Sequence, residues 1–328
     1  MNRQHLMARV LVVYLTCHLN PAWGQESGGL KPIRIGMPNR GVPNLALPAA
    51  QRYGFFRKQG LDAELIVMRP STSLQTLVSG DLDFSTVLAS AARASVSGLP
   101  LRIVMTLNLG QDLSLVVRPE IRRVEDLKGK TLAISGVGEL TDVGARIILK
   151  KYGLVPEADV KIRALFGNHP MRLSALQSGQ IDGTLMTMPY NKMAVKMGFR
   201  EISHLREFIK TPQGGLVTTA QKIRSEPEMI LRAVKAALLA SRFLKENKNE
   251  FVKLLAKESG VNDPVVAGLI HDEIFKLYSD TGIVSDEAMQ EFIAAAKEAL
   301  KVSREVSFSD IADFSFARRA AGELKEGR

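Results

Sequence analysis

Cysteine and tryptophan are almost absent from this chain of 328 residues, which contains one of each, Cys17 and Trp23. A single thiol excludes an internal disulfide and any metal site made of several cysteines. Both residues lie in the first 24 positions, where we predict a cleaved segment. The remaining chain would then contain no cysteine nucleophile, and its stability would come from a hydrophobic core.

Aromatic residues make up only 6% of the chain, and its 44 Lys and Arg residues form no long basic run despite a net charge of +10. A nucleic-acid-binding surface requires clustered positive charge with interleaved aromatic side chains. We therefore expect no nucleic acid partner. The hydrophobic content of 45% and the charged content of 24% are those of an ordinary folded protein, and the length favours two domains.

Catalytic and metal-binding motifs are also missing from the sequence. It contains no H-E-x-x-H, C-x-x-C or G-x-S-x-G and no Walker loop, and Gly136-Val137-Gly138 lacks the third glycine of a dinucleotide fingerprint. The histidines beyond the first 24 residues, His169, His204 and His271, are not spaced as a zinc pair. These absences predict a protein that is not an enzyme and that binds neither a cofactor nor a metal.

The first 24 residues have the pattern of a secretory signal peptide. Two arginines precede the apolar run Val10–Leu15, which is too short to span a membrane, and Ala22-Trp23-Gly24 supplies small residues for a cleavage site. We predict cleavage after Gly24 and a periplasmic location. Lipidation of Cys17 is the alternative, although the threonine before it fits a lipoprotein signal poorly.

The rest of the chain alternates between strand patterns and helix patterns. Ile33, Ile35 and Met37 have the period of a strand, and later apolar runs are separated by segments of helical period. This alternation predicts an α/β fold with a mostly parallel sheet.

Polar residues at the expected helix starts are predicted to cap the backbone. Asn44 precedes one helix, Ser71–Ser73 precede a helix that ends at Gly80, and Ser225 with Glu228 has the spacing of a capping box.

One segment of the sequence is repeated. L-Q-T-L-V-S-G-D-L-D-F at 74–84 returns as L-S-A-L-Q-S-G-Q-I-D-G at 173–183. A repeat of this spacing indicates a duplicated domain, so we expect two similar α/β lobes. Its aspartates, Asp83 and Asp182, are interpreted as caps for backbone N–H groups at strand starts.

The repeat also sets the predicted domain boundaries. Residues 25–118 and 215–328 would form lobe one and residues 119–214 lobe two, after a signal peptide over 1–24. The chain would cross between the lobes near Val117–Pro119 and Gly214–Val217. Two crossing strands make a hinge that bends without unfolding either lobe. The C-terminal helical segment should pack on lobe one, to which the chain has already returned.

Five segments carry a family resemblance. They are A-A-Q-R-Y-G-F-F-R-K-Q-G at 49–60, S-G-D-L-D-F at 79–84, D-L-K-G-K-T-L-A-I at 126–134, A-L-Q-S-G-Q-I-D at 175–182 and A-D-F-S-F-A-R-R-A at 312–320. In this order and spacing they resemble the periplasmic substrate-binding proteins of ABC importers for nitrate, taurine and alkanesulfonates, a group that includes thiamine-precursor-binding proteins. The resemblance implies the type II periplasmic binding protein fold, a small solute held between the lobes, and permease and ATPase subunits as partners. We expect a monomer.

One loop departs from that pattern. Many members carry a Gly-Ser-Thr stretch after the first strand of the second lobe, where this chain reads G-E-L-T-D at 138–142. Glu139 and Asp142 would repel an anion, so a neutral or zwitterionic solute is considered beside an anionic one.

Ligands of open α/β sheets bind beyond the carboxyl ends of the strands, at helix N-termini. The loops expected there carry hydroxyl and amide side chains, and they also include His169 and Thr187. The candidate ligand-binding residues are Asn39, Arg40, Asn44, Ser71, Ser73, Ser85, Thr86, Asn108, Gly138, Thr141, Asp142, Asn168, Met188 and Tyr190.

Each candidate also has an interpretation without a ligand. Arg40 would pair with an anionic group or would be a solvated loop charge. Ser71, Ser73 and Thr141 would contact solute or only cap helices, and Met188 would fill the core.

These features favour an extracytoplasmic receptor that captures a small organic molecule and delivers it to an ABC importer. The alternatives are an enzyme on the same fold acting on a pyrimidine or menaquinone precursor, and a ligand-binding sensor module.

Overall fold

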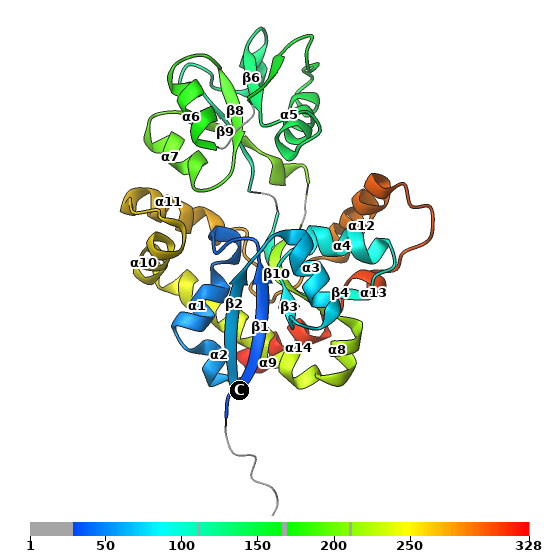
Figure 1. Cartoon of the computed structure of the whole chain (residues 1–328). Helices are drawn as coiled ribbons and strands as arrows, with labels where there is room; N and C mark the ends of the chain where they lie inside the picture. The colour runs from blue at the N-terminus through cyan, green and yellow to red at the C-terminus, as the bar shows by residue number, and fades with distance from the viewer. Residues whose placement is uncertain (1–28, 111, 166–168, 210–211, 328) are drawn as a thin grey trace, which may run out of the picture.

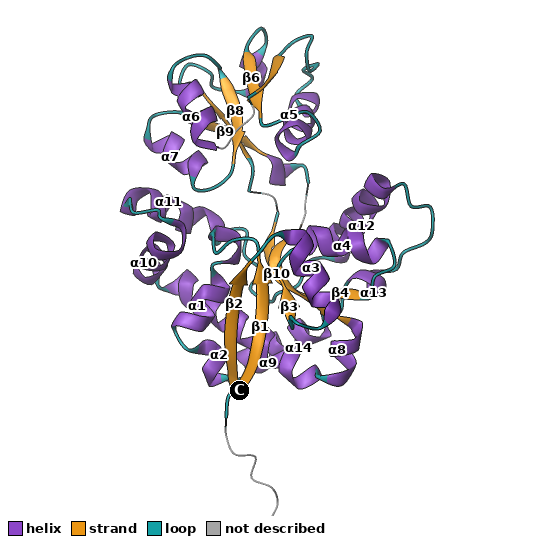
Figure 2. Ribbon diagram, in the orientation of Figure 1, coloured by secondary structure: helices purple, strands orange, loops and turns teal. Residues whose placement is uncertain are grey.

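The computed structural model describes residues 29–110, 112–165, 169–209 and 212–327, and contains two five-stranded sheets in two lobes (Figures 1 and 2). The first sheet has the order β2-β1-β3-β10-β4. Its strands are β1 Lys31–Met37, β2 Leu61–Val67, β3 Phe84–Ser85, β4 Leu101–Leu109 and β10 Pro212–Thr219. The second sheet has the order β7-β6-β8-β5-β9. Its strands are β5 Ser114–Val117, β6 Thr131–Ile134, β7 Lys161–Ala164, β8 Gly183–Met186 and β9 Arg200–His204.

The two sheets have the same plan, which confirms the two similar α/β lobes expected from the repeat. In each sheet the three strands at one edge are parallel, and the fourth strand is antiparallel to its neighbours. That fourth strand, β10 or β5, arrives from the other lobe. The other four strands of each sheet run in one direction, so each sheet is mixed but mostly parallel, as expected.

The chain passes between the sheets earlier than expected. β4 ends in the first sheet at Leu109 and β5 begins in the second at Ser114. The return runs from the 3-10 helix η3, Leu205–Glu207, to β10 at Pro212. The segments expected as crossovers, Val117–Pro119 and Gly214–Val217, instead include residues paired within sheets.

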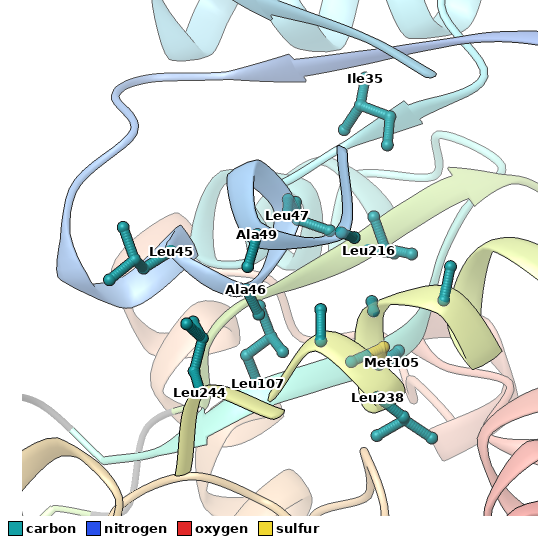
Figure 3. Packing of buried hydrophobic residues seen from close by; sticks show 14 of the residues in the cluster. Ile35, Leu45, Ala46, Leu47, Ala49, Met105, Leu107, Leu216, Leu238 and Leu244 are labelled. Atoms are coloured by element: carbon teal, nitrogen blue, oxygen red, sulfur yellow. The ribbon is translucent and has the colours of Figure 1, made fainter. Parts of the chain in front are cut away.

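Helices cover both faces of the first sheet. One hydrophobic cluster joins the sheet to helices from the N-terminal and the C-terminal parts of the chain. These helices are α1 Ala46–Arg52, α2 Phe55–Lys58, α9 Pro227–Glu246, α10 Lys248–Ser259, α11 Pro264–Ile274 and α14 Ser315–Lys325. A second cluster contains α3 Pro70–Ser79, α4 Leu88–Val96, α12 Asp286–Leu300 and α13 Phe308–Ile311. Figure 3 shows the centre of the first cluster, with Leu47 of α1, Leu107 of β4 and Leu238 of α9 among its side chains. The C-terminal helices thus pack on lobe one, as expected.

The second lobe is smaller but has the same layering. α5 Leu140–Lys151 covers one face of its sheet, and α6 His169–Gln177 and α7 Tyr190–Lys196 belong to a separate cluster. The remaining short elements are η1 Val42–Asn44, η2 Val124–Leu127 and α8 Ala220–Ser225. Among the described residues, no helix is long and apolar enough to cross a membrane.

The predicted helix caps are mostly wrong. Asn44 lies within η1, and the N-cap of α1 is Leu45. Ser71–Ser73 lie inside α3, which starts with Pro70, and Ser225 ends α8, while α9 starts with Pro227. α3 and α9 have no side-chain cap, and the proline with which each starts has no N–H to satisfy.

The aspartates of the repeat bind backbone as predicted. The Asp83 carboxylate accepts a hydrogen bond from the Arg34 N–H at 2.7 Å, and the Asp182 carboxylate accepts one from the Thr131 N–H at 2.8 Å. Asp83 therefore ties the loop before β3 to β1, and Asp182 ties the loop before β8 to the start of β6.

Candidate functional site

The carboxyl ends of the parallel strands in both sheets face the crossovers. Met186 at the end of β8 is paired with Ser114, where β5 begins after the first crossover. Leu109 at the end of β4 is paired with Pro212, where β10 begins after the second. β3 and β1 run in the same direction as β4, so the loops after β1, β3, β6 and β8 border the gap between the lobes.

A pocket of about 240 Å³ lies on the lobe-one side of this gap. It is formed by the loop after β1, η1, the start of α3, the start of α4 and the start of β10. Its described lining residues are Pro38, Asn39, Pro43, Asn44, Pro70, Thr86, Val87, Leu88, Ala89, Ser90, Pro212, Gln213 and Gly214. None of these side chains carries a formal charge.

Three buried polar atoms in and behind this pocket have no hydrogen-bond partner among the described residues. They are Asn44 Oδ1, Thr86 Oγ1 and Asn108 Oδ1. The three residues are 4%, 4% and 2% exposed, so bulk water does not compensate these atoms. Buried polar groups are nearly always bonded in folded proteins, so these atoms set the walls of this pocket apart from an ordinary core.

Asn108 lies directly behind the lining residues. Its Nδ2 donates to the Pro43 carbonyl at 2.8 Å and to the Gln213 carbonyl at 3.1 Å. The Asn44 Nδ2 donates to the Asn39 carbonyl at 3.4 Å. These bonds fix the orientation of both amides and leave their oxygens as the uncommitted atoms.

The serine candidates of lobe one take different positions. Ser73 and Ser85 are fully buried and bond each other, with 2.7 Å between their hydroxyl oxygens. Ser71 is exposed on α3. None of the three lines the pocket.

Arg40 points toward its own lobe. Its Nη2 donates to the Leu65 carbonyl at 3.0 Å, and its Nη1 lies 3.4 Å from a Glu258 carboxylate oxygen. The guanidinium group therefore already has an anionic partner within lobe one.

In the loop after β6, side chains form hydrogen bonds with the backbone of the same loop. Asp142 accepts a hydrogen bond from the Gly138 N–H at 2.8 Å and from the Arg146 Nε at 2.7 Å. Thr141 Oγ1 accepts from the Ser135 N–H at 2.8 Å. The Asp142 carboxylate thus occupies the start of α5, where the free N–H groups of a helix would otherwise attract an anionic ligand.

A second polar cluster in lobe two is formed by His169 and Arg172 at the start of α6 with Thr187 and Tyr190, which follow β8. Arg172 can only donate, so its 3.0 Å contact with His169 Nδ1 places the imidazole proton on Nε2, which lies 3.0 Å from Thr187 Oγ1. Tyr190 stacks on the imidazole, with ring centroids 5.1 Å apart. Burial, with the Arg172 charge, lowers the pKa of His169 to about 4, so the ring is neutral.

Arg172 is 2% exposed, and burial lowers its pKa from the ordinary value of a guanidinium. The negative charge of Glu139 acts in the opposite direction. Glu139 also accepts a hydrogen bond from Ser135 Oγ at 2.5 Å. The cation of this cluster therefore has its counter-charge within lobe two.

Met188 connects this cluster to the first crossover. Its N–H donates to the Asp112 carboxylate at 2.7 Å, and its buried side chain packs with the core of lobe one. Asp112 is 8% exposed, and burial raises its pKa to about 6. The charges that act on it are Lys192, Arg206 and Glu201, of which Lys192 and Glu201 form a buried ion pair at 2.6 Å.

The structure brings Asn39, Asn44 and Thr86 together in the pocket, with Asn108 behind them. Met188 and Tyr190 lie in lobe two, while Gly138, Thr141 and Asp142 are held by contacts within their own loop. Asn168 lies outside the described residues. Ser90, Gln213, Gly214 and Arg172 were not among the sequence-based candidates. Two sequence features could have pointed to them. The Gly214-Gly215 pair marks a close backbone approach, and Arg172 follows His169 by three residues, which puts both on one helix face.

Comparisons with known proteins agree with this fold. A profile described as NMT1/THI5 like matches residues 45–250. The chain is 28% identical over 213 residues to the taurine-binding periplasmic protein of Escherichia coli, covering 60% of this chain and 63% of that protein. It is 25% identical over 228 residues to the nitrate import ATP-binding protein NrtC of Synechocystis sp., covering 62% of this chain and 33% of that protein. The chain thus spans less than two thirds of the length of either curated relative.

Solved structures extend the likeness over most of the chain. A putative periplasmic sulfonate-binding protein, SsuA from Methylobacillus flagellatus, superposes with a TM-score of 0.71 at 20% identity, covering 90% of this chain and 95% of that one. The desulfurization enzyme DszB superposes with a TM-score of 0.67 at 16% identity, covering 91% and 100%. The fold is that of type II periplasmic binding proteins, and by the extent of the profile match this chain belongs to the NMT1/THI5-like family.

Proposed function

We propose that this protein is an extracytoplasmic receptor that captures a small organic solute between its two lobes and delivers it to an ABC importer. The observation that supports this most strongly is the pocket at the gap between the lobes. Its walls combine uncharged polar side chains with apolar ones. Such a pocket recognises a solute by hydrogen bonds and releases it unchanged.

The partners and location follow from the same proposal. The taurine-binding relative is named as periplasmic, and the signal-peptide pattern of residues 1–24, which lie outside the described residues, supports export of this chain. A permease and an ATPase would then receive the solute from a monomeric receptor.

The alternative is an enzyme on this fold, which DszB exemplifies. In the structure of DszB with biphenyl-2-sulfinic acid a cysteine is replaced by serine, whereas no residue after Cys17 is a cysteine in this chain. His169 is neutral and already bonded on both ring nitrogens. These observations favour binding over turnover.

Solute capture can be tested by a thermal-shift screen of small metabolites with a pocket-filling variant. Solute at 100 times its dissociation constant should stabilise the protein by about 2.7 kcal/mol. Ser90→Trp, which fills the pocket, should abolish this shift. Ser303→Trp should retain it, because Ser303 is exposed and lines no part of the pocket.

Mass spectrometry of the solute after incubation separates the receptor from the enzyme. The proposal predicts that the bound solute is recovered unchanged. A product that accumulates with the wild-type protein but not with Ser90→Trp would contradict it, as would a screen in which Ser90→Trp binds every solute that the wild type binds.

A further inference from the structure

We propose that the end of lobe two opposite the solute gap binds the anionic headgroups of a phospholipid surface. The residues that form it, 127–131 and 150–163, are called the distal face. This inference goes beyond the proposed function, because it assigns a second contact to the chain. Such a contact would keep the receptor beside the membrane of its importer while the solute gap stays open.

The fold brings the distal face together from two separate segments. Lys130 precedes β6 and Lys161 begins β7, and the Lys161 N–H donates to the Lys130 carbonyl at 2.9 Å. α5 runs back from the gap and ends with Lys150 and Lys151. These positions are at the amino ends of the parallel strands, so they lie opposite the carboxyl ends that border the gap.

The loop between α5 and β7 is held against the start of β6. The Gly129 N–H donates to the Asp159 carbonyl at 2.7 Å, and the Val155 N–H donates to the Asp159 carboxylate at 2.9 Å. Lys128 forms an ion pair with the same carboxylate at 3.3 Å. These bonds join side chains that are distant in sequence into one continuous surface.

The first argument is the excess of positive charge on this surface. Residues 127–131 and 150–163 contain six basic side chains and two acidic ones. Of the six, Lys128 alone has an ion pair with a described residue. The other five are Lys130, Lys150, Lys151, Lys161 and Arg163, of which Lys130 is half-buried and four are exposed. Cations that no acid of the chain neutralises attract an anionic surface, and each lysine near it strengthens binding about fivefold.

The second argument is the pair of apolar side chains exposed among these lysines. Val155 is 56% exposed and Tyr152 is 36% exposed. A lipid surface has an apolar layer beneath its charged headgroups, and tyrosine is enriched at that boundary. A soluble polyanion such as polyphosphate has no layer that would take up Val155. A phospholipid surface therefore fits the distal face better than a soluble polyanion does.

Sedimentation with vesicles measures this contact. The chain from Gln25 onward is used, so that the apolar run at residues 10–15 does not contribute. The vesicles contain phosphatidylcholine alone, or phosphatidylcholine and phosphatidylglycerol in equal parts. The inference predicts binding to the mixed vesicles, little binding to phosphatidylcholine alone, and release from the mixed vesicles as sodium chloride is raised.

Two double variants with the same change in net charge locate the contact. Lys150→Gln with Lys151→Gln should weaken binding to the mixed vesicles about twentyfold. Lys257→Gln with Lys325→Gln is the matched control, because these lysines are exposed in the last turns of α10 and α14 in lobe one. The control should keep the wild-type affinity for vesicles, and both variants should keep the thermal shift caused by solute.

The variant Val155→Ser separates a lipid surface from a soluble polyanion. It removes apolar area and no charge, so it should weaken binding to the mixed vesicles without changing the salt dependence. It should leave any binding of polyphosphate unchanged.

Three outcomes would overturn the inference. Equal weakening by the two double variants would show a response to net charge alone. Vesicle binding that Val155→Ser leaves unchanged would assign the distal face to soluble polyanions. Vesicle binding without preference for phosphatidylglycerol, or none at all, would remove the contact itself. Each outcome leaves solute capture standing, because the thermal-shift screen measures it separately.

Discussion

Two glycines allow the backbone to approach closely enough to form the pocket. A β-carbon on Gly36 would lie 2.4 Å from Ser73 Oγ, so glycine lets α3 pack directly on β1. Gly214 has a φ of +59°, and a β-carbon there would lie 2.3 Å from the Pro43 carbonyl oxygen. Glycine at 214 thus lets the start of β10 meet η1 and close one side of the pocket.

The buried carboxyl of Asp112 makes the stability of the folded chain depend on pH. Burial raises its pKa from 3.8 to about 6, so the folded chain binds this proton more strongly than the unfolded chain does. Its stabilising contribution is therefore present below about pH 4 and is lost as the pH rises through about 6. The difference corresponds to roughly 3 kcal/mol.

The variant Asp112→Asn cannot titrate and isolates this effect. The free energy of unfolding of the wild type minus that of the variant should fall between pH 4 and pH 7, as measured by denaturant titration. His204, whose pKa burial lowers, titrates in both chains and cancels from the difference. A difference that is flat or rises over this interval would show that Asp112 is not buried as described.

At the scale of single residues, the sequence predicted which loops lie at the pocket better than it predicted where their side chains point. Asn39, Asn44 and Thr86 reach the pocket, as the rule for open sheets suggests. Ser73 instead bonds Ser85, and Asp142 folds back onto the Gly138 N–H. These choices depend on neighbours that are distant in sequence or on loop geometry, and one sequence does not specify either.

At the scale of elements, the repeated aspartate ties β3 to β1 in lobe one and β8 to β6 in lobe two. The Asp182 backbone N–H also donates to the Thr131 carbonyl at 2.9 Å, so the two residues exchange two hydrogen bonds. Asp182→Ala should lower the free energy of unfolding by about 1–2 kcal/mol, because it leaves the Thr131 N–H without an acceptor. Asp182→Asn retains an acceptor oxygen and should cost less.

Denaturant titration of these two variants beside Asp62→Ala tests the role of the motif. Asp62 is exposed and has only a 3.7 Å ion pair with Arg57, so its loss should be close to neutral. An Asp182→Ala variant no less stable than Asp62→Ala would mean that the motif does not hold the strands.

The elements themselves were largely predictable, and their exact starts were not. Apolar periodicity located the strand at Ile33–Met37 and the long helix that contains Leu238. The predicted caps at Asn44 and Ser225 failed because the chain forms another short helix at each position. Hydroxyl and amide residues near a helix start compete with such local turns, and packing decides between them.

At the scale of the whole molecule, the lobes are joined along one side. α7 of lobe two packs on α11 of lobe one, and Lys196 forms an ion pair with Asp263 across this contact. Beside it lies an apolar pocket of about 420 Å³. Arg206 and Glu273 make a second ion pair between the lobes. In Figure 1, α5 and α12 lie on the opposite side of the crossovers.

The architecture of two lobes was predictable from the repeat, whereas the crossover positions were not. β5 reads as a continuation of lobe one along the sequence, but it pairs with β8 and β9 of lobe two. Which sheet a buried strand joins depends on pairing partners far away along the chain, so local patterns do not determine it.

The account depends on lobes that close on a bound solute, and a distance measurement across the gap tests this directly. In a Cys17→Ser background, labels on Lys150→Cys and Gln290→Cys span α5 and α12, and labels on Met197→Cys and Leu269→Cys span the joined side; all four positions are exposed. With the solute identified by the screen, the first distance should shorten and the second should stay constant, because closure would turn about the joined side. An unchanged Lys150–Gln290 distance with solute bound would contradict capture between the lobes.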